Sequence, residues 1–247
     1  MKQTINVLWT GGLDSTYLMF RLSQFDTEIQ PYYIIDPLRK STQMELKAID
    51  LIATELKKHP DTKAEIHPVK IIKRKDIAPD TEIIQAWKYL HEHYELGTQY
   101  NFLARFARQQ HLHLVVGVLF GERSKVENAL RKPVELALEE GYNGMFLHAV
   151  SEDKSHPAYI VFENLYFPTF MKNLEKPKEW EYLKSHGAEK IAQMTWFCHR
   201  PVLGMTCGHC NPCKDALNEG MSFRVSKIGY LFGGIRLYKD KLQSIFK

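Results

Sequence analysis

The sequence predicts an α/β fold, a doubly wound parallel sheet followed by a C-terminal extension. Two observations carry this prediction. Through the first two-thirds of the 247 residues, apolar runs typical of buried strands alternate with segments of helical apolar spacing. After Pro168 the alternation stops, and all four cysteines then fall within one short segment. We therefore expect the sheet in residues 1–170 and the extension in residues 171–247.

The expected strands are short apolar runs. Pro68 lies inside the third run and has no amide hydrogen to donate, so we expect that strand near a sheet edge. The five runs are Ile5–Trp9, Ile29–Asp36, Ala64–Ile72, His111–Leu119 and Ala158–Phe162.

The expected helices have apolar residues that recur every three or four positions. Pro133 interrupts the fifth of them, and Gly187 is suited to end the sixth. The helices are expected from Ser15 onward and at Met44–Leu56, Thr81–Tyr94, Gln99–Gln110, Arg123–Glu140 and Lys176–His186.

Composition narrows the class of protein. With 44% hydrophobic and 25% charged residues, the chain has the balance of a globular domain. A net charge of +4 permits an anionic small-molecule substrate but gives no strong signal for nucleic-acid binding. No apolar run approaches the roughly 20 residues of a membrane helix, and we expect no signal peptide before the first strand. We expect a cytoplasmic protein without membrane association.

The most distinctive motif is the segment Thr10–Ser15 (Thr-Gly-Gly-Leu-Asp-Ser), which directly follows the first strand. A strand that turns through glycines into a helix directs backbone N–H groups and a helix dipole at one point, which attracts phosphate. The motif matches neither the P-loop nor the dinucleotide-binding fingerprint. Thr10 and Ser15 can donate hydroxyl hydrogen bonds, and Asp14 can cap the helix or help to hold Mg²⁺. The alternative is an ordinary strand-to-helix turn.

The cysteines have the spacing Cys-x8-Cys-x2-Cys-x2-Cys. Four thiols within one short segment of a chain expected to be cytoplasmic favour a closed tetrahedral zinc site with a structural role. A redox pair and unligated thiols are the alternatives, and His199 and His209 are near enough in sequence to replace a cysteine. The expected ligands are Cys198, Cys207, Cys210 and Cys213.

The Thr10–Ser15 motif resembles the pyrophosphate loop of the N-type ATP pyrophosphatases, whose fold is adenine nucleotide α hydrolase-like. Taken together with the cysteine spacing, it resembles the 7-cyano-7-deazaguanine synthases of the queuosine pathway. Further likeness is found at Asp36 with Arg39, Gly97–Ala104, Val116–Val118 and Thr195–Cys198.

The resemblance implies an ATP-dependent ligase. A deazaguanine carboxylate would attack the α-phosphate of ATP, ammonia would displace AMP to give an amide, and a second ATP would dehydrate the amide to a nitrile. It also implies a homodimer, with Asp14 and Ser15 as catalytic residues. Asp36 would touch the ribose or a metal, or cap its own turn. The implied ATP contacts are Leu8, Trp9, Thr10, Gly11, Gly12, Leu13, Asp14, Ser15, Thr16 and Asp36.

Departures from the family pattern leave the acceptor open. Thr10 replaces the usual serine, Thr98 and Gln99 replace an arginine and an asparagine, and Leu119–Lys125 replaces an aspartate-rich segment. The acceptor could be another carboxylate, a protein or nucleic acid, or a tRNA base that is adenylated. A non-catalytic binding protein is a further alternative. Arg39 and Lys40 could meet phosphate, but we expect them as solvated surface charge. The candidate substrate residues are Gly97, Gln99, Glu122, Arg123 and Lys125, of which the last three could equally start an exposed helix.

Overall fold

The computed structural model describes residues 2–121, 124–130, 134–138 and 144–245. Its contacts divide the chain into two compact units. The first, here called the sheet unit, comprises Met1–Trp9, Tyr17–Ile35 and Pro60–Glu175. The second, here called the cysteine unit, comprises Thr10–Thr16, Asp36–His59 and Lys176–Lys247. The cysteine unit therefore contains the glycine loop as well as the four cysteines.

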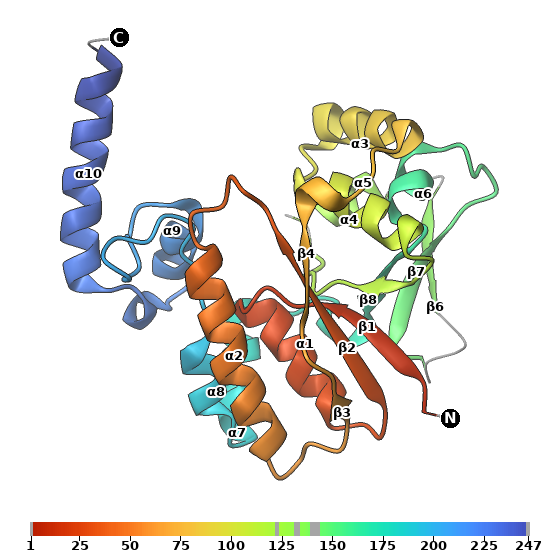
Figure 1. Ribbon diagram of the computed structural model, residues 1–247, viewed down its shortest axis with the longest axis horizontal. Helices are drawn as coiled ribbons and strands as arrows, with labels where there is room; N and C mark the ends of the chain where they lie inside the picture. The colour runs from red at the N-terminus through yellow and green to blue at the C-terminus, as the bar shows by residue number, and fades with distance from the viewer. Residues whose placement is uncertain (1, 122–123, 131–133, 139–143, 246–247) are drawn as a thin grey trace. The chain divides into compact units, whose positions relative to one another are not determined.

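The sheet unit is built on a mostly parallel sheet (Figure 1) with the order β3-β2-β1-β5-β8-β7-β6, and β4 also pairs with β2. β1, β2, β5 and β8 are parallel neighbours, while β6 and β7 are antiparallel additions. β2 is buried along most of its length, as expected of a strand with neighbours on both sides and apolar faces. The strands are β1 Thr4–Leu8, β2 Glu28–Ile35, β3 Glu65–Ile66, β4 Lys70–Lys73, β5 Leu114–Val115, β6 Glu135–Leu138, β7 Phe146–Val150 and β8 Leu165–Pro168.

Three sequence expectations about this unit are corrected. The Ala64–Ile72 strand is two strands, because Pro68 cannot donate to a ladder, and both pair with β2 at the edge of the sheet. Ala158–Phe162 is a helix and not a strand, since His156 and Pro157 start it and the next strand follows immediately as β8. Within Arg123–Glu140, the described residues form a short helix before Pro133 and a strand after it.

Four helices pack against one another in the sheet unit and cover one side of its sheet (Figure 1). Their inward side chains form the main apolar core with β5, β8 and the end of β2. Each of the two long helices was predicted to within one residue. The helices are α3 Thr81–Tyr94, α4 Gln99–Gln109, α5 Lys125–Ala129 and α6 Pro157–Phe162, with the 3₁₀ turns Arg74–Asp76 and Thr169–Met171.

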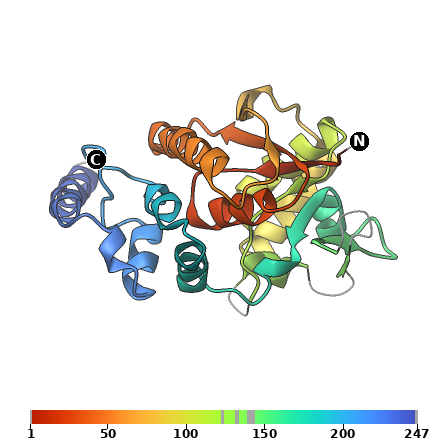
Figure 2. The same ribbon diagram turned by 90° about the horizontal axis from the view of Figure 1, so that it is seen from below.

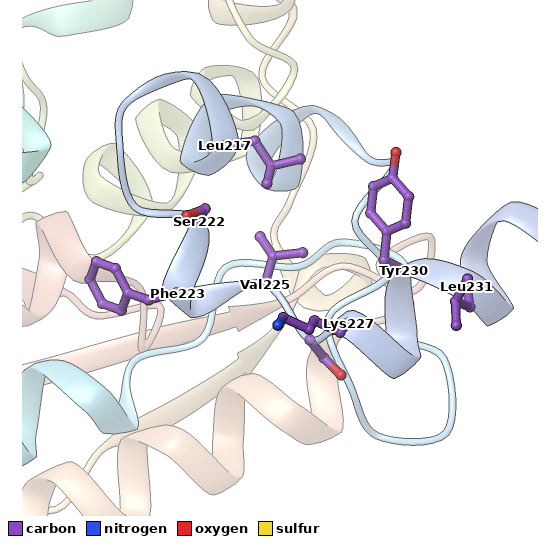
Figure 3. A pocket seen from close by; sticks show the side chains of 8 residues that line it. Leu217, Ser222, Phe223, Val225, Lys227, Tyr230 and Leu231 are labelled. Atoms are coloured by element: carbon purple, nitrogen blue, oxygen red, sulfur yellow. The ribbon is translucent and has the colours of Figure 1, made fainter.

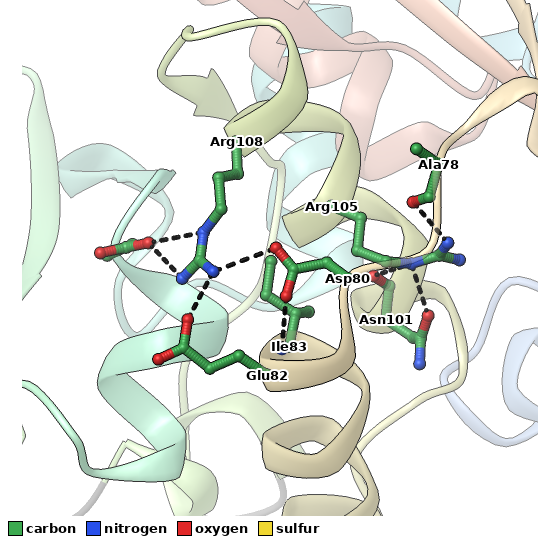
Figure 4. Close-up of polar contacts among 8 residues, drawn as sticks. Ala78, Asp80, Glu82, Ile83, Asn101, Arg105 and Arg108 are labelled. Carbon is green, nitrogen blue, oxygen red and sulfur yellow. Dashed lines mark hydrogen bonds and ion pairs between the residues drawn. The ribbon is translucent and has the colours of Figure 1, made fainter.

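Arg108 on α4 ties three of these elements together (Figure 4). Its guanidinium donates to Glu163 after α6 at 2.7 Å, to Glu82 on α3 at 2.6 Å and to Asp80 at 3.1 Å. Asp80 also caps α3 by accepting from the backbone N–H of Ile83 at 3.0 Å. Burial lowers the pKa of Arg108, but the hydrogen bonds to the carboxylates outweigh it, so that its pKa is raised and its charge is fixed.

The cysteine unit is helical. α2 packs on α8, and α7 packs on α8 through a turn in which Gly187 takes a positive φ, as the sequence predicted. α1, which spans Leu13–Ser23, begins in this unit and continues into the sheet unit. The other helices are α2 Thr42–Lys58, α7 Lys176–Ser185, α8 Glu189–Met194, α9 Asn211–Asn218, the 3₁₀ turn Ser222–Arg224 and α10 Lys227–Ile245.

Candidate functional site

The glycine loop closes on itself through its two hydroxyl residues. The Oγ of Ser15 accepts a hydrogen bond from the backbone N–H of Thr10 at 3.2 Å and lies 3.1 Å from the Thr10 hydroxyl oxygen. Ser15 also lies within hydrogen-bonding distance of the Gly12 carbonyl, at 3.3 Å, and Thr16 makes the first helical bond of α1 to that carbonyl. The hydroxyls therefore hold the loop in shape and stand at the start of α1.

Gly11 is required by its backbone conformation and by its neighbours. Its φ is +71°, and a Cβ at this position would lie 2.9 Å from the Glu45 carbonyl oxygen and 3.2 Å from Ile49 on α2. The carbonyl of Gly11 accepts from the backbone N–H of Trp196 at 2.8 Å. The loop is thus clamped between α2 and the segment that leads to the first cysteine.

Three ionisable side chains from elsewhere in the cysteine unit interact with Asp14 of the loop: Lys176, Glu179 and Arg224. Lys176 and Glu179 are three residues apart on α7 and so share a helix face. The negative charge of Asp14 is the largest cause that raises the pKa of Lys176, so this lysine carries its positive charge beside the loop at neutral pH.

Glu179 has the most unusual environment of these residues. Its side chain is fully buried, including both carboxyl oxygens. Burial raises the pKa of Glu179 well above its ordinary value, and the charge of the adjacent Asp14, together with hydrogen bonding between the two carboxyl groups, raises it further. A buried carboxyl beside a second carboxylate is costly, and a bound cation would lower that cost.

Arg224 is held in place from several sides. Its guanidinium donates to the Thr195 hydroxyl at 2.6 Å and lies over the rings of Trp180 and Phe197. Burial lowers its pKa to about 10, while Asp14 and Glu179 act in the opposite direction, so it stays charged at neutral pH. Because Thr195 immediately precedes Trp196, one short segment binds both Arg224 and the carbonyl of Gly11.

Lys176, Glu179 and Arg224 were not predicted as site residues. Charged residues on a helix of low mean hydropathy are normally solvated, so the sequence gave no reason to bring them to the loop. The spacing of Lys176 and Glu179 on one helix face was the only available signal, and it is common on exposed helices.

Two predicted residues near the loop have structural partners. Asp36 accepts from the backbone N–H of Leu38 at 3.1 Å, which is the turn-capping alternative among those considered for it. Arg39 corrects the expectation of surface charge, because it forms an ion pair at 3.2 Å with Glu45, whose side chain is only 6% exposed. Glu45 also accepts from Ser41 at 2.7 Å. These contacts fix the start of α2, which packs against Gly11.

The four cysteines converge as their spacing predicted. Their sulfur atoms all lie within 4.8 Å of one another. The Cys210 sulfur is 3.4 Å from that of Cys213 and 3.9 Å from that of Cys198. Four sulfurs bound tetrahedrally to zinc at 2.3 Å would be about 3.8 Å apart, so the cluster could hold such an ion.

Backbone and thiol contacts suit this cluster to a cation. Cys207 and Cys210 direct their backbone N–H groups at the sulfurs of Cys198 and Cys207, at 3.2 and 3.4 Å. The neighbouring thiols lower the pKa of Cys210 and raise that of Cys213, because only part of the cluster can ionise without a positive charge. His209 is not needed as a ligand, since its Nε2 is engaged with the Tyr230 carbonyl at 2.8 Å.

The remaining candidates belong to the sheet unit or lie outside the described residues. Leu8 and Trp9 are buried at the end of β1. The Gly97 carbonyl accepts from the Trp87 indole at 3.1 Å, Gln99 begins α4, and Lys125 pairs with Glu95 at 2.8 Å on the surface. Glu122 and Arg123 lie outside the described residues.

Among the described residues, no helix has both the length and the apolar character needed to cross a bilayer. No model of a known protein family matches the chain, and no curated protein matches its sequence.

Proposed function

We propose that the chain is an ATP-dependent carbon–nitrogen ligase similar to the 7-cyano-7-deazaguanine synthases, with an adenine nucleotide α hydrolase-like fold. The single observation that carries the proposal is the Thr10–Ser15 loop, in which Gly11 packs closely against α2 and Asp14 interacts electrostatically with Lys176 and Arg224. A glycine loop at a helix start with Lys176 and Arg224 beside it suits a polyphosphate. The cysteine cluster supports the same family through its spacing.

The donor sets fit the cofactors that the proposal requires. Asp14 and the adjacent buried carboxyl of Glu179 would hold Mg²⁺, which takes one or two carboxylates together with phosphate oxygens. Bound there, the ion would neutralise charge on the phosphates. The four cysteines would hold a structural Zn²⁺, because a shell of four sulfurs leaves no open position for a substrate.

The chain's own residues would act by alignment and charge neutralisation. The loop N–H groups would bind the phosphates, and Lys176 and Arg224 would stabilise the pyrophosphate that leaves. An acceptor carboxylate oxygen forms a bond to the α-phosphorus as the bond to the β-phosphate oxygen breaks. Ammonia then forms the carbon–nitrogen bond, AMP departs, and the nitrogen gives up a proton.

The test is release of AMP and pyrophosphate from ATP with ammonium and 7-carboxy-7-deazaguanine, with the deazaguanine product identified by mass spectrometry. We expect AMP together with an amide or nitrile product. Asp14→Asn should reduce AMP release at least about a hundredfold, whereas Asp50→Asn on the exposed face of α2 should not. Absence of AMP with this acceptor, with other carboxylates and with tRNA would refute the proposed function. AMP without a deazaguanine product would refute only the acceptor.

A further inference from the structure

The cavities beside α10 and beside β4 differ in the charge around them. A wide cavity of about 650 Å³ lies at the base of α10, where Leu217 and Val225 point toward each other and Lys227 is the single charged residue of the lining (Figure 3). A smaller one of about 270 Å³ lies between β4, the 3₁₀ turn Arg74–Asp76 and the end of α4. Basic residues surround the smaller cavity, so it can select an occupant by charge as well as by shape.

The strand β4 (Lys70–Lys73) is an edge strand. It pairs in parallel with β2, and no other described strand pairs with it. Figure 1 shows β4 beside β2, and in Figure 2 the same segment lies at the rim of the sheet. The side of β4 away from β2 is open along four residues, of which Ile71 is 52% exposed. An open strand edge is a template on which another extended chain can pair.

The hydrogen-bonding groups on this open side belong to Ile71 and Lys73. The carbonyl of Tyr32 in β2 accepts from Trp9 at 2.9 Å, so Tyr32 faces β1 and the next residue, Tyr33, faces β4. Tyr33 lies opposite Ile71. In a parallel pair a residue bonds to the two neighbours of the residue opposite it, so the neighbours of Ile71 bond to β2, whereas Ile71 and Lys73 direct N–H and C=O groups outward. These outward groups have no hydrogen-bond partner among the described residues.

The cavity beside this edge is suited to one large apolar side chain. A cavity of about 150 Å³ admits a benzene ring, so one of about 270 Å³ has room for a leucine or phenylalanine side chain. An extended peptide on β4 would direct every second side chain to the face of the sheet on which the cavity lies. Apolar and amide residues line the cavity: Ile71, Ile72, Ile77, Phe106, Gln109 and Gln110.

Positive charge gathers along the same edge. Within residues 70–76 the single acidic residue is Asp76. The three lysines of this segment are exposed and form no ion pair with any described residue. Burial lowers the pKa of Arg105, and the positive charge of Arg74 lowers it further. The basic residues of the segment are Lys70, Lys73, Arg74 and Lys75.

This charge determines which kind of strand the edge can accept. Lysines on an edge strand ordinarily keep other chains from pairing, because an uncharged strand would have to lie against them. A strand with acidic residues reverses this effect, since opposite charges across a strand pair attract. A nucleic acid fits less well, because single strands are held by stacking on exposed rings, and the nearby rings of Tyr32, Phe102 and Phe106 are buried.

We propose that the edge of β4 binds an acidic, extended segment of a partner protein as an added strand of the sheet. The segment exchanges backbone hydrogen bonds with Ile71 and Lys73 and places one large apolar side chain in the cavity. Its carboxylates lie beside the lysines of the edge. The proposal does not depend on the proposed function, because its residues belong to the sheet unit and not to the glycine loop or the cysteine cluster.

The test measures binding of a fluorescein-labelled peptide, Glu-Ile-Glu-Phe-Glu-Ile-Glu, to the full-length protein by fluorescence anisotropy near physiological ionic strength. We expect saturable binding of one peptide per chain. Lys73→Glu with Lys75→Glu should weaken binding by about tenfold or more, because it places like charges beside the peptide. Lys57→Glu with Lys58→Glu makes the same change of net charge at exposed residues of α2 and should keep the affinity within about twofold.

The backbone and the cavity are tested separately. Ile71→Pro removes an outward N–H and leaves the bonds of its neighbours to β2, so it should weaken binding by about tenfold or more, whereas Ile71→Val should not. A peptide with serine in place of phenylalanine should bind about tenfold more weakly, because it loses the burial of the ring. Circular dichroism checks the folding of each variant. If Ile71→Pro does not fold, two peptides methylated on alternate backbone nitrogens decide, and at least one should bind about tenfold more weakly.

Absence of saturable binding up to about 1 mM peptide would overturn the proposal. An equal loss in the two charge-reversal pairs would also overturn it, because binding would then follow net charge alone. Full affinity of folded Ile71→Pro, or of both methylated peptides, would exclude strand addition. Tighter binding of a fluorescein-labelled oligouridylate of equal charge would assign the surface to nucleic acid instead.

Discussion

Substitution of Gly11 by alanine tests whether the glycine loop is fixed by its close approach to α2. Alanine at a φ of +71° costs about 1–2 kcal/mol, because left-handed backbone crowds its Cβ. The same Cβ would lie 2.9 Å from the Glu45 carbonyl oxygen, a backbone atom that cannot move without α2. Overpacking of this kind costs about 1–3 kcal/mol, so the total loss of stability should be about 2–5 kcal/mol.

Gly220→Ala is the matched control. Gly220 has a φ of +77°, yet nothing lies within 4 Å of the position that its Cβ would take. Both variants share the backbone strain and the reduced entropy of the unfolded chain, so their difference isolates the contact with α2. Gly11→Ala should therefore lower the melting temperature further than Gly220→Ala does, by about 3 °C for each kcal/mol of contact strain.

The assay is thermal unfolding followed by circular dichroism, repeated with ATP present. ATP should raise the melting temperature of Gly220→Ala but not of Gly11→Ala, because only Gly11 belongs to the proposed phosphate loop. Equal melting temperatures for the two variants would refute the reasoning about close approach. An equal rise with ATP would refute the placement of the nucleotide at this loop.

Three further predictions concern the cysteine cluster, the buried carboxyl of Glu179 and the ion-pair network of Arg108. Elemental analysis should find one zinc ion per chain in the unaltered protein and less than one in Cys213→Ser. Asn218→Ser, at an exposed position, should keep the full zinc content. Full zinc in Cys213→Ser would contradict the site. Because burial raises the pKa of Glu179 above its ordinary 4.5, the folded protein holds a proton that the unfolded chain releases, so stability should fall as pH rises above 4.5. Glu179→Gln should remove this pH dependence of the free energy of unfolding, measured in urea without added magnesium. The same pH dependence in the variant would contradict the assignment to Glu179. Arg108→Ala should lower the free energy of unfolding, measured in urea, by about 2 kcal/mol, because it leaves three carboxylates without their shared partner. Lys88→Ala removes a single exposed ion pair and is the control. An equal loss in the two variants would contradict the role of Arg108.

Long periodic segments were predictable, and short ones were not. Thr81–Tyr94 carries an N-cap aspartate and a clear apolar face, so its helix matches the sequence expectation at both ends. The apolar run at Ala158–Phe162 gave no such basis, because a few apolar residues fit a buried strand and a buried helix equally well. Its packing against α3 decided the matter, and packing partners distant in sequence are not visible in a local pattern.

Local sequence determined the features whose chemistry depends on neighbours along the chain. The loop needs glycine at a positive φ next to a helix start, and the four sulfurs that converge all come from residues 198–213. Tertiary structure alone decided which distant charges face the loop and which side of α10 is covered. Lys176, Glu179 and Arg224 meet Asp14 because α7 and the turn before α10 fold back to it. The large apolar side chains of α10 from Ile228 to Tyr238 are exposed because Gly229 and Gly233 fit against the backbone of Thr206 and Cys207.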